Sequence, residues 1–188
     1  FSSMTGSVED AVSLGADAVG NTLYVGSPRQ DEDIHQLQIV REDCDKYNMP
    51  LVVWSYPRGA AIEGKGGRDS LYAVDYAARV ALEMGADIVK LNIPKQGPKD
   101  SEQPGDYVGI DYDYGEGARR VVESAGRCLV LFSGGSKLGD EDLMTKARTA
   151  MESGATGLIF GRNMWQRPFD DALAMTRSVQ DMLQGHGA

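Results

Sequence analysis

The sequence predicts a single α/β domain built around a parallel sheet, and two observations support this fold class. Three similar segments recur along the chain, at 14–19, 84–89 and 153–158. Their glycines, Gly15, Gly85 and Gly154, are 70 and 69 residues apart, and each segment is typical of a helix that ends at a left-handed glycine directly before a strand. Two further apolar runs lie between them, at 51–54 and 129–132. Strands that alternate with helices, with no low-complexity linker, indicate one α/β domain over residues 1–188.

The individual elements follow from the same pattern. Strands are expected at about 16–25, 50–56, 87–93, 128–133 and 156–160, where short runs rich in Val, Ile and Leu are typical of a parallel sheet buried on both faces. Helices are expected at about 8–14, 32–47, 70–84, 141–153 and 168–183. Ser7 is the candidate N-cap of the first helix, and Glu9 and Asp10 in its first turn suit the helix dipole. The longest loops, 59–69 and 94–113, are rich in Gly, Lys, Asp and Pro and are candidates to cover an active site.

Composition and charge disfavour several classes of partner. The chain has 188 residues, 41% of them hydrophobic, and its net charge of −9 repels a nucleic-acid backbone. No apolar stretch approaches the roughly 20 residues of a membrane helix, so we expect no membrane partner. Two cysteines, Cys44 and Cys128, and two histidines, His35 and His186, form neither a disulfide framework nor a zinc-binding pattern. We therefore expect no metal, no cofactor and a reducing compartment, and any bound anion needs a local positive site.

The run from Ile88 to Ile93 places a lysine inside a predicted strand. Alternation puts Ile88, Lys90 and Asn92 on one face of the strand and the intervening residues on the other. Burial in a parallel sheet would lower the pKa of Lys90 and leave a neutral amine that can attack a carbonyl group. Spacing alone also allows a lysine that reaches solvent or an ion-pair partner near the strand end. Lys90 is therefore the candidate nucleophile.

The segment Trp54–Gly59 ends the preceding strand. Trp54 and Tyr56 are two residues apart and so share a strand face, and Pro57 ends the strand. Tyr56 could transfer protons at the mouth of the sheet, with Trp54 as a wall. The alternative is core packing with a capped hydroxyl, which these residue types alone favour.

Two glycine-containing sites follow the last two predicted strands. The first is Ser133, Gly134, Gly135 and Ser136, and the second is Gly161 with Arg162. Glycines after a parallel strand let backbone N–H groups approach an anion, and arginine adds positive charge. A lone pair of glycines is more often a plain turn, but two such sites in consecutive units indicate phosphate binding.

Together these motifs resemble the archaeal-type class I fructose-bisphosphate aldolases over essentially the whole chain. The resemblance rests on four segments, Trp54–Gly59, Gly85–Lys90, Ser133–Gly135 and Gly161–Gln166. It implies a (β/α)8 TIM barrel in which Lys90 is the Schiff-base lysine, Tyr56 transfers protons and Trp54 contacts the substrate. It further implies that the substrate phosphate is bound by Ser133, Gly134, Gly135, Gly161 and Arg162.

The resemblance also implies an activity and its setting. The activity is reversible, metal-independent cleavage of fructose 1,6-bisphosphate to dihydroxyacetone phosphate and glyceraldehyde 3-phosphate, in glycolysis or gluconeogenesis, by a cytoplasmic homo-oligomer. Two alternatives stay open. One is a sibling Schiff-base aldolase or transaldolase acting on another phosphorylated or dideoxy sugar, and the other is a non-catalytic, phosphate-binding barrel remnant. The combination of Lys90, Tyr56 and Arg162 argues against the remnant, because a binding protein needs no buried amine.

The chain departs from the family in length. If Lys90 lies on the sixth strand, as the resemblance implies, the five strands are strands four to eight and strands one to three are missing from this single barrel domain. A whole barrel takes about 250 residues. Because the chain begins at Phe1 rather than an initiator Met, we expect further residues upstream. The strands at 16–25 and 156–160 are then the sheet edges, and the apolar interior of the open sheet faces water. We expect the missing segment or neighbouring chains to cover them.

Overall fold

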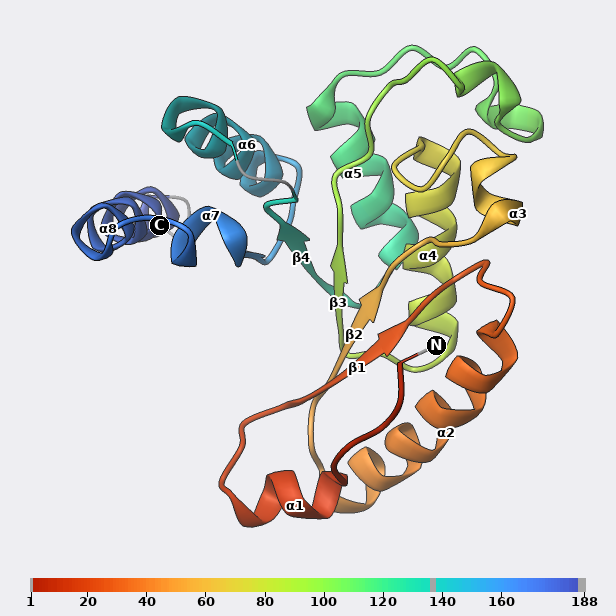
Figure 1. Ribbon diagram of the computed structural model, residues 1–188, viewed down its shortest axis with the longest axis vertical. Helices are drawn as coiled ribbons and strands as arrows, with labels where there is room; N and C mark the ends of the chain where they lie inside the picture. The colour runs from red at the N-terminus through yellow and green to blue at the C-terminus, as the bar shows by residue number, and fades with distance from the viewer. Residues whose placement is uncertain (1, 136–137, 186–188) are drawn as a thin grey trace.

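The computed structural model describes residues 2–135 and 138–185 and contains one parallel sheet (Figure 1). The strands are hydrogen-bonded in sequence order: β1 (Val19–Leu23), β2 (Leu51–Ser55), β3 (Ile88–Leu91), β4 (Leu129–Ser133) and β5 (Gly157–Ile159). Each lies within a predicted strand, so the α/β class is confirmed. The edges of the sheet are β1 and β5, also as predicted. Ser136 and His186 lie outside the described residues.

The five predicted helices are present with small shifts at their ends. They are α1 (Val8–Ser13), α2 (Gln30–Tyr47), α4 (Leu71–Glu83), α6 (Asp140–Glu152) and α8 (Phe169–Gln184). Ser7 caps α1 as expected, in a capping box with Asp10. The three repeated glycines, Gly15, Gly85 and Gly154, have φ angles of 73°, 83° and 92°. The predicted helix–glycine–strand unit is therefore confirmed at all three places.

One full helix escaped prediction, α5 (Tyr114–Ala125). Gly115 and Gly117 lower its helix propensity, which explains the omission. Its N-terminal signal was nevertheless in the sequence, since Asp113 and Glu116 form a capping box. Three short elements lie in the predicted loops: α3 (Ala60–Glu63), η1 (Asp100–Glu102) and η2 (Gly105–Tyr107). A fourth, α7 (Arg162–Trp165), lies between the last predicted strand and the last predicted helix.

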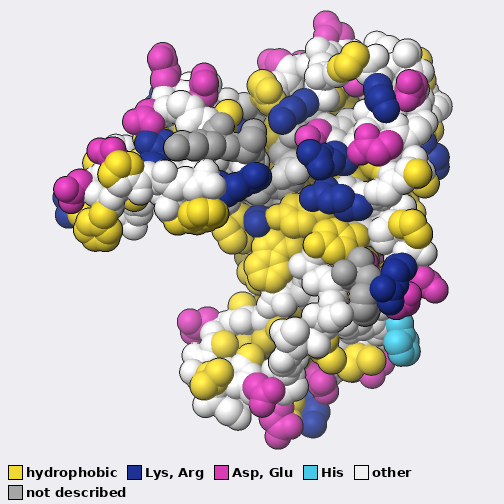
Figure 2. Space-filling model, viewed as in Figure 1, with side chains coloured by type: hydrophobic (Ala, Val, Ile, Leu, Met, Phe, Trp, Pro, Cys, Tyr) yellow, Lys and Arg dark blue, Asp and Glu magenta, His cyan; other side chains and the backbone are white. Residues whose placement is uncertain are grey.

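The two faces of the sheet differ in burial. The face that packs on the helices carries fully buried side chains such as Leu23, Val53, Val89 and Phe132. The opposite face, which carries Lys90, is only partly buried in β2, β3 and β5. Figure 2 shows a hydrophobic patch at the centre of the molecule with Lys and Arg side chains along its upper border. The prediction of burial on both faces is therefore wrong for this chain, because the described residues supply helices to one face alone.

Two hydrophobic clusters stabilise the described residues. The larger cluster joins the sheet to α2, α4 and α5, and the smaller one joins Leu143 of α6 to Met175 and Val179 of α8. Cys44 and Cys128 are free and buried in the larger cluster. Among the described residues, no helix combines the length and the apolar character needed to cross a membrane.

Candidate functional site

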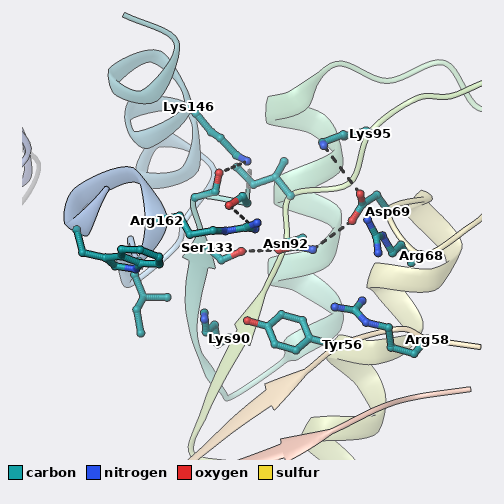
Figure 3. Close-up of a pocket in the computed structure, with 16 residues that line it drawn as sticks. Tyr56, Arg58, Arg68, Asp69, Lys90, Asn92, Lys95, Ser133, Lys146 and Arg162 are labelled. Carbon is teal, nitrogen blue, oxygen red and sulfur yellow. Dashed lines mark hydrogen bonds and ion pairs between the residues drawn. The ribbon is translucent and has the colours of Figure 1, made fainter. Parts of the chain in front are cut away.

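A cavity of about 580 Å³ lies at the carboxyl ends of β2, β3, β4 and β5 (Figure 3). Parallel strands bring their carboxyl ends to one edge of a sheet, so side chains distant in sequence meet there. Seven of the residues expected at the site line the cavity: Tyr56, Lys90, Ser133, Gly134, Gly135, Gly161 and Arg162. Trp54, the eighth, does not line it but lies beside Lys90.

Lys90 lies in β3, paired in register with Trp54 of β2 and Leu131 of β4. Its Nζ is 5.9 Å from the centre of the Trp54 ring and 5.5 Å from the centre of the Tyr56 ring. The predicted face is confirmed, since Val89 and Leu91 point into the buried core and Lys90 points away from it. Lys90 is half-buried rather than enclosed, because no described element covers this face of the sheet. Its amine lies near two aromatic rings of the neighbouring strand and opens into the cavity.

The Trp54 ring packs against the backbone of β1 at Gly20. A Cβ atom added at Gly20 would lie 1.9 Å from the ring, so only glycine fits beneath the tryptophan. Sequence reasoning did not assign a role to Gly20, although a glycine inside a strand is a known signal of close approach. Gly20 therefore allows the Trp54 ring to occupy its position beside Lys90.

Tyr56 lies directly after β2, where its N–H donates to the Leu23 carbonyl at 2.9 Å and continues the ladder. The side chain is half-buried at the cavity, so the core-packing alternative is wrong. Figure 3 shows its hydroxyl pointing toward Lys90. The Arg58 guanidinium lies 5.3 Å from the ring centre. A phenol between an amine and a guanidinium is well placed to move protons.

The glycine turn after β4 is surrounded by cations. The Gly134 carbonyl accepts a hydrogen bond from Lys146 Nζ at 3.3 Å, and the Gly135 carbonyl accepts one from Arg162 Nη2 at 2.9 Å. Gly135 has a φ of 69°, which favours glycine. Burial lowers the pKa of Lys146, the charge of Lys95 adds to this shift, and Asp69 opposes it. The turn thus carries two cations that an anion can share.

A polar chain crosses the cavity from this turn. Ser133 donates through Oγ to Asn92 Oδ1, and Asn92 Nδ2 donates to Asp69 Oδ1 at 3.1 Å. Asp69 Oδ2 is 3.9 Å from Lys95 Nζ. Asp69 and Lys95 were missed as site residues, and the available signal was their position in the two loops expected to cover an active site.

The cavity is strongly positive although the chain is acidic. Six cationic side chains line it: Arg58, Arg68, Lys90, Lys95, Lys146 and Arg162. Among the described lining residues, Asp69 supplies the one carboxylate. Within residues 2–135 and 138–185, no three His, Cys, Asp or Glu side chains gather where they could share a metal ion. The residues therefore suit an anionic ligand with a carbonyl group within reach of an amine.

The sequence matches known proteins over most of its length. Residues 3–167 match the model of the DeoC/LacD family aldolases. The chain is 38% identical over 180 residues to the class 1 fructose-bisphosphate aldolase of Thermoproteus tenax, covering 95% of this chain and 60% of that protein. It is 31% identical over 175 residues to the 2-amino-3,7-dideoxy-D-threo-hept-6-ulosonate synthase of Halobacterium salinarum, covering 93% of this chain and 57% of that protein. The chain thus spans less than two thirds of each relative.

The fold is also similar to solved structures. A Schiff base-forming fructose-1,6-bisphosphate aldolase superimposes with a TM-score of 0.80 and 37% identity, covering 97% of this chain and 64% of that one. An archaeal fructose-1,6-bisphosphate aldolase, with its catalytic lysine covalently bound to the carbinolamine intermediate, gives 0.77 at 37% identity, covering 94% of this chain and 61% of that one. From the match of the family model to most of its length, the chain belongs to the DeoC/LacD family of aldolases.

Proposed function

We propose that this chain carries the reactive lysine and the phosphate site of a class I, metal-independent fructose-1,6-bisphosphate aldolase. The observation that carries the proposal is the position of Lys90, beside the rings of Trp54 and Tyr56 and in the same cavity as the cation-bearing glycine turn. The 38% identity to the Thermoproteus aldolase supports the choice of substrate. A sugar bisphosphate has the negative charge that this positive cavity lacks.

The chemistry begins at the Lys90 amine. Its nitrogen attacks the ketone carbon of the open-chain sugar, and loss of water gives a protonated imine. A base removes the proton of the hydroxyl on the fourth carbon, the bond between the third and fourth carbons breaks, and its electron pair moves toward the imine nitrogen. The aldehyde leaves, the third carbon is protonated, and water then releases dihydroxyacetone phosphate and the free amine. Tyr56 supplies and removes these protons, and the glycine turn with Arg162 holds the phosphate so that the carbonyl reaches Lys90.

The proposal extends to the barrel as a whole. The five strands are strands four to eight of a (β/α)8 barrel, residues 1–188 form one domain with them, and upstream strands cover β1 and β5. Support comes from the sequence order of the parallel strands and from the greater length of the relatives. In such barrels the phosphate sits at the loops after the last two strands, which here carry Gly134–Gly135 and Gly161–Arg162. A cytoplasmic location, which the two free cysteines support, and assembly as a homo-oligomer complete the proposal.

A sibling Schiff-base aldolase is the second candidate, favoured by the 31% identity to the dideoxy-heptulosonate synthase. Such an enzyme would use the same lysine and the same phosphate site with another sugar. A non-catalytic phosphate-binding role would give Lys90 and Tyr56 no function. The rings of Trp54 and Tyr56 near the Lys90 amine therefore argue against that role.

An assay of the full-length protein with excess EDTA separates the three functions. We expect cleavage of fructose 1,6-bisphosphate that EDTA leaves intact and that Lys90→Met lowers at least about a thousandfold. Lys46→Met, which removes an exposed lysine near the end of α2, is the matched control and keeps full activity. Preference for another phosphorylated or dideoxy sugar assigns the sibling activity. Phosphate binding without turnover of fructose 1,6-bisphosphate or of any other phosphorylated or dideoxy sugar assigns the binding role and refutes the proposal.

A further inference from the structure

We propose that Asp69 is a positioning residue that fixes the phosphate-binding turn relative to Lys90 and so makes the enzyme selective for phosphorylated ketones. This inference rests on the proposed function. It concerns a side chain that lies in the loop between α3 and α4, outside every motif on which the family resemblance depends.

Asp69 sets the orientation of the Asn92 amide. An ionised carboxylate only accepts hydrogen bonds, so Asn92 must turn its Nδ2 donor toward Asp69 Oδ1, at 3.1 Å. The amide oxygen of Asn92 then faces β4, where it accepts the Ser133 hydroxyl. Ser133 immediately precedes the Gly134–Gly135 turn. Because its proton is directed to Asn92, Ser133 positions the turn and does not donate to a phosphate in this arrangement.

The same chain of contacts reaches the reactive lysine through the backbone. Asn92 is two residues after Lys90 and on the same side of the chain, so the distance from the turn to the amine is set through Asn92. Figure 3 shows Ser133, Asn92 and Asp69 in line above Lys90 and Tyr56. A ketose phosphate has a short, fixed span between its phosphate and its carbonyl carbon. Holding the turn at one distance from Lys90 therefore favours a ketone that carries a phosphate.

Asp69 also balances the positive charge at this end of the cavity. Its Oδ2 pairs with Lys95 Nζ at 3.9 Å, and the backbone carbonyl of Asp69 accepts a hydrogen bond from the backbone N–H of Lys95 at 2.8 Å. The Asp69 carboxylate is the acidic group among six cationic side chains in the described lining. Loss of the carboxylate makes this end of the cavity more positive, and that change alone favours an anion, so a loss with the phosphorylated ketone reports the missing hydrogen bond. The positioning role of Asp69 therefore depends on its hydrogen bond to Asn92 rather than on its charge.

The test compares two ketones that differ only in the phosphate. Formation of the Lys90 adduct is trapped with borohydride in the full-length protein, using dihydroxyacetone phosphate or dihydroxyacetone below saturation. We expect Asp69→Ala to lower the rate of adduct formation with the phosphorylated ketone about tenfold, as for loss of a hydrogen bond to a charged group. The rate with the unphosphorylated ketone should stay unchanged. Asn92→Ala breaks the same chain at its centre and produces the same selective loss. If Asp69→Ala fails to fold, Asn92→Ala therefore carries the test.

Two further variants separate the hydrogen bond from the charge. Asp69→Asn keeps an oxygen that accepts from Asn92 and so restores most of the selectivity. Asp111→Asn is the matched control, because Asp111 is an exposed carboxylate that accepts an amide hydrogen bond from Gln96 and does not line the cavity. Its rates with both ketones stay at the wild-type value.

Failure of this inference differs from failure of the proposed function. If Asp69→Ala lowers the rate of adduct formation equally with both ketones, or with neither, the positioning role is overturned. If the wild-type protein forms no adduct with either ketone, the proposed function fails, and binding of inorganic phosphate measured by calorimetry still tests Asp69. There, a Kd about tenfold weaker in Asp69→Ala supports the positioning role and an unchanged Kd contradicts it.

Discussion

Tyr56 and Lys90 meet because β2 and β3 are neighbours in register, so residues near their carboxyl ends project into one cavity. The Trp54 ring also lies near the amine, at 5.9 Å, and Gly20 makes room for this ring. The roles of these residues can be separated. In the proposed mechanism the amine forms the covalent bond, whereas the phenol carries the proton transfers that follow.

We therefore expect Tyr56→Phe to lower the cleavage rate by about 10²–10⁴-fold and to leave the Lys90 adduct detectable. Phenylalanine keeps the ring beside the Lys90 amine and removes only the hydroxyl. Steady-state cleavage and borohydride trapping, run on the same preparation, give the two readings. Unchanged turnover in Tyr56→Phe would remove the tyrosine from the mechanism.

At the scale of elements, the long loop that follows β3 is anchored on α4 and α5. Gln103 accepts the Tyr72 N–H at the start of α4, and Tyr107 donates to Asp75 within that helix. Tyr112 packs on Gly117 of α5, where a Cβ atom would lie 2.8 Å from its ring. The glycine that hid α5 from sequence prediction is thus the one that lets the loop approach it.

Substitutions at two glycines of α5 test whether the loop packs on Gly117. Gly117→Ala should lower the free energy of unfolding by about 1–3 kcal/mol, because the new methyl group overlaps Tyr112 and Pro94. Gly115→Ala should leave it unchanged or raise it by up to about 1 kcal/mol, since its nearest neighbour is the Asp113 side chain at 3.3 Å and alanine favours the helix. Urea unfolding measures both. Equal effects at the two positions would show that the loop does not pack on Gly117.

The tyrosines of this loop predict a loss of stability in alkali. Burial raises the pKa of Tyr112 to about 12, with Asp100 adding to the shift, and burial followed by the Asp75 hydrogen bond raises the pKa of Tyr107. Since both pKa values are raised in the folded state, their stabilisation is complete below the ordinary value near 10 and is lost as the pH rises through the folded values.

The expected loss through Tyr112 is about 2–3 kcal/mol between pH 10 and the pKa of about 12. Tyr112→Phe should flatten this part of the curve, because phenylalanine has no proton to lose. Unfolding free energies at neutral pH and near pH 12 give the comparison. A Tyr112→Phe protein as alkali-sensitive as the wild type would rule out this tyrosine as the cause.

At the scale of the molecule, an acidic protein gathers six of its 19 Lys and Arg side chains in one cavity. The net charge is −9, yet six cations and one carboxylate line the site. The face of the sheet that carries Lys90 is uncovered by the described helices, and β1 and β5 are its edges. Both features agree with the proposal that upstream strands close the sheet over Lys90.

The order of the strands could be predicted from sequence because each helix–glycine–strand unit is local and successive parallel strands lie side by side. Lys90, Tyr56 and Arg162 could be placed at the site because they lie in or next to strands whose ends are visible as changes in pattern. Asp69 and Lys95 could not, because their positions depend on how two loops pack. The residue types alone could not show the uncovered face, since apolar residues such as Leu129 and Leu131 signal burial whether or not the covering segment is present. That face was expected only from the strands that the resemblance implies are missing.

The most direct test of the account is the identity of the lysine that binds substrate. Three lysines line the cavity within the described residues, Lys90, Lys95 and Lys146. The full-length protein is incubated with dihydroxyacetone phosphate, reduced with borohydride, digested and mapped by mass spectrometry. The account predicts the adduct on the Lys90 peptide and its absence in Lys90→Met. An adduct on Lys95 or Lys146 instead, or no adduct on any lysine, would contradict it.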